Sequence, residues 1–229
     1  MFTITEILLM SLLGLDLALA ASSRLLHCIR LVALQGIVLG MLPVFFHIGD
    51  EEKFLPPLAV IIAVVVSIGI KGVLLPWFLA RAMRKTQIKR ELEPYVGYSL
   101  SLFIIMLAGV FSFWFCRQLG LVPHVCSQFA LPVAFTTMIT GLFLVIARKK
   151  AITQALGFLV FENGIGIFGA GMLVESGLLV ELGILLDVVV LVFVMGITLF
   201  QIQRQFQHMD SDHLKLLGDW KKNEEGAGE

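Results

Sequence analysis

Four ionisable side chains interrupt the long apolar stretches of this sequence: Asp16, Lys71, Glu162 and Asp187. Even on scales derived from membrane insertion, a charged side chain at the centre of a membrane helix costs about 2.5–3.5 kcal/mol. Such groups therefore face a bundle interior or a wet cavity, pair with one another, and exchange protons when water links them. These four residues are the candidate proton-transfer groups of the chain.

The stretches that carry these residues are long enough to cross a membrane as helices. Of the 229 residues, 58% are hydrophobic and 15% are charged, whereas ordinary soluble domains are about 45–50% apolar. About 20 apolar residues, at about 1.5 Å each, span a hydrocarbon core about 30 Å thick. The sequence therefore predicts an all-α, polytopic membrane protein of about seven spans. We place these spans at about residues 3–21, 25–47, 56–80, 97–116, 127–147, 152–174 and 177–200.

The basic residues predict how the spans are oriented, because Lys and Arg concentrate in short cytoplasmic loops. With the N-terminus outside, only Lys53 and Arg117 fall in the outer loops. Apart from Lys71, all other basic residues then fall at the inner ends of spans, in the inner loops or in the tail. The sequence therefore predicts an outside N-terminus and a cytoplasmic C-terminus.

Counting inward from the outer span ends places the four ionisable residues in one layer near the membrane midplane. At about 1.5 Å per residue, Asp16 lies about 20 Å deep and Lys71 about 22 Å. Glu162 lies about 18 Å deep and Asp187 about 15 Å. Four charges on four helices at similar depth indicate a common site.

Glu162 and Asp187 are expected to be neighbours, because they lie on consecutive antiparallel helices joined by a short loop. Two carboxylates in a poorly hydrated site do not both ionise easily, so one of them is expected to hold a proton. Lys71, if close, would instead favour the ionised acid.

Each candidate also has a purely structural interpretation. Glu162 and Asp187 are then permanently protonated and hydrogen-bond a neighbouring helix, a contact worth about 0.6 kcal/mol on average. Asp16 lies near the inner end of its helix, within reach of Arg24 or the lipid headgroups. Lys71 lies about 14 Å from the inner end of its span, too deep to reach the interface easily, which favours an ion-paired or functional role.

Glycines surround two of the candidates. Around Glu162 they are dense enough to allow close helix packing or, alternatively, a local π or unwound turn. Gly69, Gly72 and Pro76 predict a kink beside Lys71, because a proline leaves a backbone carbonyl without its helical donor. That carbonyl is a plausible partner for the lysine.

The other chemistry-bearing residues form no recognisable site. Cys28, Cys116 and Cys126 lack the spacing of a zinc or iron–sulfur site. They are expected to be unpaired thiols packed in the helix bundle. Alternatively, Cys116 and Cys126, which flank the same outer loop, form a disulfide. The histidines and aspartates at 208–213 are more simply explained by a solvated tail than by a metal site. Since no nucleotide-binding loop, catalytic triad or nucleic-acid motif is present, we expect no catalytic residue, cofactor, metal or nucleic-acid partner.

Much of the sequence resembles known membrane subunits. Residues 141–169, GLFLVIARKKAITQALGFLVFENGIGIFG, are similar to the K subunit of bacterial proton-pumping NADH dehydrogenase and the C subunit of multisubunit cation/proton antiporters. Both have a helix that ends in a basic turn and then a helix with a central Glu. With IKGVLLPWFLARAMRK, LDVVVLVFVMGI and the tail QFQHMDSDHLKLLGDW, nearly the whole chain resembles the component E family of hydrogenase-4 and formate-hydrogenlyase-type complexes.

The resemblance implies a division into a four-helix extension at 1–126, a three-helix module at 127–203 and a cytoplasmic tail at 204–229. It implies that Glu162 corresponds to the proposed proton-transfer Glu of those relatives. Asp187 stands where the three-span relatives have a Glu and is displaced from it by about a turn or more, which weakens the correspondence there.

The resemblance further implies a membrane subunit of an energy-converting nickel–iron hydrogenase-type complex, in the cytoplasmic membrane of a bacterium or archaeon. Proton or Na⁺ translocation is expected here, and redox chemistry in partner subunits. The expected partners are antiporter-like and quinone-site-type membrane subunits, lipids, and a soluble arm with hydrogenase and iron–sulfur centres that docks on loop 81–94 and the tail. A purely structural anchor of that complex and a subunit of a cation/proton antiporter remain alternatives.

Overall fold

The described part of the chain is a bundle of helices. The computed structural model describes residues 4–48, 58–86, 96–119, 127–148 and 151–171, and the separate positions Val189, Val192, Met195 and Gly196. Its helices are α1 (Ile4–Ala21), α2 (Leu25–Ile48), α3 (Leu58–Ser67), the π-helix η1 (Ile68–Leu74), α4 (Leu75–Thr86), α5 (Tyr98–Leu119), α6 (Ala130–Ala147) and α7 (Ala151–Gly171).

Six helical segments are long and apolar enough to cross a membrane: α1, α2, the continuous α3–η1–α4 rod, α5, α6 and α7. They correspond to the first six predicted spans, so the all-α, multi-pass membrane class is confirmed. The seventh predicted span, at 177–200, lies almost entirely outside the described residues, although the positions described within it are helical. The count of seven spans and the orientation stay predictions.

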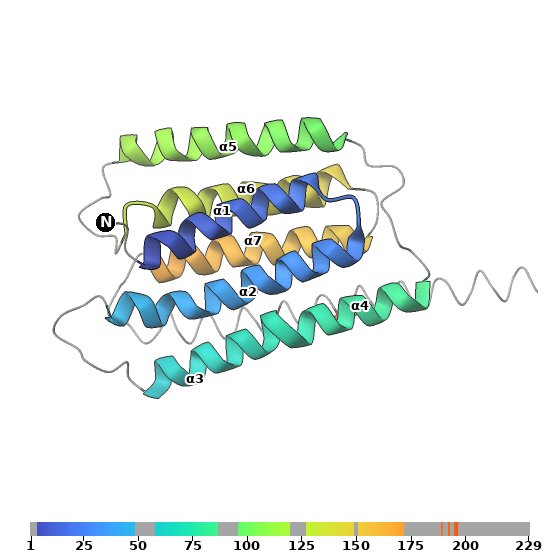
Figure 1. Ribbon diagram of the computed structural model, residues 1–229, viewed down its shortest axis with the longest axis horizontal. Coiled ribbons are helices and arrows are strands. Elements are labelled where there is room, and N and C mark those ends of the chain that lie inside the picture. Colours follow the sequence, from blue (N-terminus) through green and yellow to red (C-terminus); the bar gives the residue numbers. More distant parts are fainter. Residues whose placement is uncertain are drawn as a thin grey trace, which may run out of the picture.

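The bundle has a buried centre and two exposed edges. Figure 1 shows α5 at one edge and the α3–η1–α4 rod at the other, with α1, α2, α6 and α7 between them. Of the residues in the most apolar stretch of each helix, 61% are buried in α6 and in α7, but only 22% are buried in α5. Large apolar side chains such as Phe103, Val110 and Trp114 are exposed along α5, as expected for a helix that faces lipid hydrocarbon.

Two apolar clusters fill the interior, and buried polar residues lie between them. One cluster includes Leu19 and Leu159, and the other includes Leu12 and Ile167. Along α1, α2, α6 and α7, the polar residues fall between members of the two clusters. We call this group the polar layer. It consists of Asp16, Gln35, Lys71, Thr137, Thr140, Glu162 and Asn163, all of them buried.

Glycines bring α6 and α7 into backbone contact. A Cβ atom on Gly157 of α7 would lie 2.8 Å from the backbone nitrogen of Val145, and one on Gly164 would lie 2.7 Å from that of Met138. A Cβ on Gly141 of α6 would in turn clash with the backbone of α7. Only hydrogen fits at these positions, as in other close pairs of membrane helices. The contact therefore fixes the height and rotation of α7 against α6.

Gly164→Ala is expected to destabilise the protein by about 1–3 kcal/mol, because the added methyl group meets the backbone of α6. Gly169→Ala on the same helix is the matched control, since nothing lies within 4 Å of a Cβ built there. Thermal unfolding of the full chain in detergent measures the difference. Equal melting temperatures for the two variants would contradict the backbone contact.

Candidate proton-transfer site

The centre of the site is a buried ion pair between Lys71 and Glu162. The Lys71 Nζ donates a hydrogen bond to the Glu162 Oε1 over 2.6 Å. The two side chains are 6% and 2% exposed, so water screens this pair far less than it screens a surface pair. The pair joins the third span to the sixth.

Lys71 reaches α7 from the π-helical turn η1. The backbone N–H of Leu75 donates to the carbonyl of Ile70, five residues earlier, which is the π-helical pattern. The sequence permits this pattern because two glycines fall within η1 and Pro76, which has no N–H to donate, follows it. π turns are rare and frequently occur at functional sites. Here the turn carries the buried lysine.

Glycines on α2 admit this turn into the bundle. A Cβ atom on Gly36 would lie 2.7 Å from the Lys71 Cβ, and one on Gly40 would clash with the Ile68 side chain. The two glycines are four residues apart and therefore share one face of α2. The backbone at Lys71 thus lies against α2, and its side chain extends past that helix to α7.

Asp16 on α1 forms the second part of the polar layer and is completely buried. The Gln35 Nε2 donates to its Oδ1 over 2.9 Å, and the Thr137 Oγ1 donates to its Oδ2 over 2.7 Å. Both carboxyl oxygens therefore accept hydrogen bonds from neutral groups. The network ties α1 to α2 and α6.

The two parts of the polar layer meet at α2. Gln35 bonds to Asp16, and the next residue, Gly36, contacts Lys71. Successive residues of a helix point about 100° apart, so the acid on α1 and the ion pair on η1 and α7 approach the same turn of α2 from two directions. Three of the four residues of the predicted layer, Asp16, Lys71 and Glu162, are thus buried in the bundle, whereas Asp187 lies outside the described residues. The common layer of four charges stays a prediction.

The structure brings together Lys71 and Glu162, whose proximity the sequence left open. It places Asp16 inside the bundle rather than beside Arg24 or the lipid headgroups. The segment around Lys71, where a kink is expected, is the π-helix η1, whereas α7 is α-helical around Glu162. Asp187 lies outside the described residues, so its contact with Glu162 stays a prediction, as do the proton-transfer roles.

Other sequence-based predictions fall largely outside the described residues. Cys126 and the tail from residue 204 lie outside the described residues. The division of the chain into a four-helix extension, a three-helix module and a tail therefore stays a prediction. Cys28 is buried and Cys116 is a partly exposed free thiol.

Sequence reasoning missed the residues that support Asp16. Gln35 is the single polar side chain in the run LVALQGIVLGML, residues 31–42, which was an available signal. Thr137 lies in a group of buried threonines on α6, a weaker signal because threonine is common in membrane helices. Arg148, which the sequence placed in a basic loop, is 2% exposed.

The arrangement is suited to holding and passing a proton. The ammonium of Lys71 is the hydrogen-bond donor and the carboxylate of Glu162 the acceptor, so the two groups have the contact that a direct proton transfer requires. Thr137 adds a hydroxyl able both to donate and to accept. Among the described residues, no three His, Cys, Asp or Glu side chains are grouped as metal ligands.

Comparison with known proteins gives one informative similarity. The chain is 35% identical over 193 residues to the uncharacterized protein Rv0085 of Mycobacterium tuberculosis (strain ATCC 25618 / H37Rv). The aligned region covers 83% of this chain and 85% of that protein. No protein-family model matches the chain, and no solved structure matches it. The similarity therefore extends over most of both chains but carries no activity with it.

Lys71→Met and Glu162→Gln are each expected to destabilise the protein by about 3–5 kcal/mol, because each removes the opposite charge from a buried ion. The double variant is expected to recover much of this loss, since neither charge then remains. Thermal unfolding of the four proteins in detergent measures the coupling. Losses that simply add would show that the two side chains do not stabilise each other.

Asp16→Ala is expected to cost about 1–3 kcal/mol for each buried donor that loses its acceptor. Asp16→Asn is expected to cost less, because one carboxamide oxygen still accepts. Ser11→Ala on the same helix is the control, since the hydroxyl of Ser11 is exposed and bonds only locally. The same unfolding assay applies, and a neutral Asp16→Ala would contradict a supporting role for the network.

Proposed function

We propose that this chain, which belongs to the same family as the mycobacterial protein Rv0085, is a membrane subunit of an energy-converting complex of the nickel–iron hydrogenase type. In this proposal the polar layer contributes to proton or Na⁺ translocation through the membrane. Redox chemistry occurs in partner subunits.

The observation that carries the proposal is the buried ion pair of Lys71 and Glu162. Taking two charges out of water costs several kcal/mol per ion, and apolar residues of similar volume are often as stable or more stable. Ionisable residues inside membranes typically mark ion pathways or proton relays. A pair at mid-span that is held by a π turn and by glycines on two helices supports such a role.

The geometry suggests how a proton would move. A proton on the Lys71 Nζ passes to the Glu162 Oε1 along their hydrogen bond, which leaves a neutral amine and a neutral acid. Reprotonation of the amine from one side and release from the acid to the other side complete a transfer. The Asp16 carboxyl group, linked through Gln35 to the turn of α2 beside Lys71, is the nearest described acid of the layer to serve as a second station.

The rest of the assembly follows from the resemblance of the sequence. Antiporter-like and quinone-site-type membrane subunits would pack against the exposed edges of the bundle. A soluble arm with hydrogenase and iron–sulfur centres would dock on loop 81–94 and the tail. The host membrane would be the cytoplasmic membrane of a bacterium or archaeon.

The central test replaces Glu162 by Gln in the host, within the intact complex. Because Glu162→Gln also destabilises the chain, proton uptake is measured per assembled complex. The complex that assembles is expected to keep its redox activity, while its proton uptake in inverted membrane vesicles falls by at least about tenfold, since transfer through the pair needs a titrating group. Glu6→Gln, the same chemical change in the first turn of α1, is the matched control and is expected to keep full uptake.

Three other outcomes would replace this proposal. Normal proton uptake in Glu162→Gln would show that the acid does not conduct. Loss of the whole complex in that variant, with Glu6→Gln unaffected, would favour a structural anchor. Ion exchange that needs no electron donor would favour a subunit of a cation/proton antiporter, and its dependence on Na⁺ would identify the ion.

A further inference from the structure

A second buried charge lies at the end of the bundle, away from the polar layer. Arg148 follows α6 directly and is 2% exposed. Its guanidinium carbon lies 4.6 Å from the centre of the Tyr98 ring, at the start of α5. Its Nη2 donates a long hydrogen bond of 3.4 Å to the carbonyl of Ala20, in the last turn of α1. The side chain is therefore held in place by two neighbouring helices.

These contacts leave the charge of Arg148 without an anion. In the part of the chain that the structure describes, Arg148 takes part in no salt bridge. Its Nη1 atom is also buried and has no hydrogen-bond partner there. A guanidinium presents its donors as a rigid planar fork that fits carboxylate and phosphate oxygens. One nitrogen of this fork is thus available for an acceptor that the described residues do not supply.

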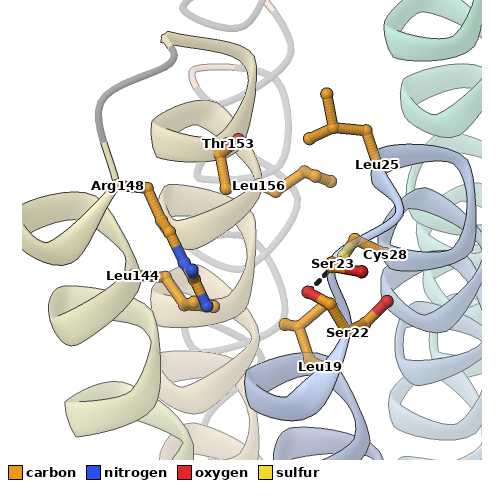
Figure 2. Close-up of a pocket in the computed structure, with 9 residues that line it drawn as sticks. All are labelled: Leu19, Ser22, Ser23, Leu25, Cys28, Leu144, Arg148, Thr153 and Leu156. Carbon is orange, nitrogen blue, oxygen red and sulfur yellow. Dashed lines mark hydrogen bonds between the residues drawn. The ribbon is translucent and has the colours of Figure 1, made fainter. Parts of the chain in front are cut away.

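A hollow adjoins the guanidinium. Figure 2 shows Arg148 and Leu144 on one side of it and Leu19, Ser22 and Ser23 on the other. The empty space of this hollow is about 300 Å³ when its open side is included.

Two helix N-termini border the same hollow. α2 begins at Leu25 and α7 at Ala151, and Leu25 and Thr153 line the space. The first backbone N–H groups of a helix have no partner within it and carry partial positive charge, which attracts anions. Ser22 and Ser23 add hydroxyl donors between α1 and α2. The charge, the helix ends and the hydroxyl groups all favour an anionic oxygen.

We propose that Arg148 and this hollow bind a phosphate group, supplied either by a phospholipid headgroup or by free phosphate. One phosphate oxygen accepts a hydrogen bond from the Arg148 guanidinium, and the rest of the group lies at the open side of the hollow. The hollow lies at the end of the bundle where α1 and α6 end and α2, α5 and α7 begin. Its lining includes four leucines, which favours a lipid over the free ion.

The test is a binding titration of the full chain in detergent, followed by native mass spectrometry. The probes are dioleoylphosphatidylglycerol, dioleoylglycerol, which has the same acyl chains without the phosphate, and inorganic phosphate. Phosphatidylglycerol is expected to bind about tenfold or more tightly than dioleoylglycerol, the effect of a charge-assisted hydrogen bond. Equal affinity for these two lipids would overturn the proposal.

Variants locate the site. Arg148→Gln is expected to weaken phosphatidylglycerol binding about tenfold or more. Arg30→Gln is the matched control, because it removes an exposed positive charge near the same end of the bundle, and it is expected to change binding less than about twofold. If Arg148→Gln does not fold, Ser23→Leu decides, since it fills the hollow while Arg148 stays in place. Wild-type affinity in Ser23→Leu or in folded Arg148→Gln would overturn the proposal.

Competition separates the two sources of phosphate. Displacement of the bound phosphatidylglycerol by millimolar inorganic phosphate would assign the site to the free ion. Retention of the lipid under the same conditions would assign it to a headgroup. None of these binding measurements depends on Lys71 or Glu162. They therefore test the phosphate site separately from the proposed ion translocation.

Discussion

The constraint on which the rest of the structure depends is the contact of two opposite charges in an apolar bundle. An ammonium and a carboxylate stay charged away from water only if each is held close to the other. The chain meets this requirement with local devices: a π turn that carries Lys71, glycines on α2 that let this turn approach, and glycines between α6 and α7 that hold Glu162. Each device departs from regular helix packing at the height of the pair.

Polar contacts have particular weight here because lipid supplies little hydrophobic drive for helix association. Two apolar clusters fill the space above and below the polar layer, and apart from the close glycine contact of α6 with α7, such packing alone would allow helices to slide or rotate. The hydrogen bonds of Asp16 to α2 and α6, and the ion pair between η1 and α7, fix one register. The same residues thus define both the geometry of the bundle and its candidate function.

The sequence predicted what depends on length and composition. The six described spans follow from apolar runs, and counting along them predicted similar heights for Lys71 and Glu162, which agrees with their contact. Their contact was not predictable, because hydropathy does not state which helices are neighbours, and the third and sixth spans are far apart in the chain. The π turn escaped prediction because glycines and a proline allow several distortions. The sequence placed Arg148 in a basic loop. Its burial was not predictable because it depends on contacts with Tyr98 and Ala20, which lie on other helices.

The network around Asp16 also constrains how the protein is made. Gln35 follows this acid by 19 residues in the chain, but Thr137 follows it by 121. At about 5–20 residues per second, a ribosome needs roughly 6–24 s to synthesise that interval. The first helix therefore enters the membrane well before its acid has its final environment. Some temporary surroundings, whether water, the insertion machinery or α2 alone, must accommodate Asp16 until α6 arrives, so the bundle closes late in synthesis.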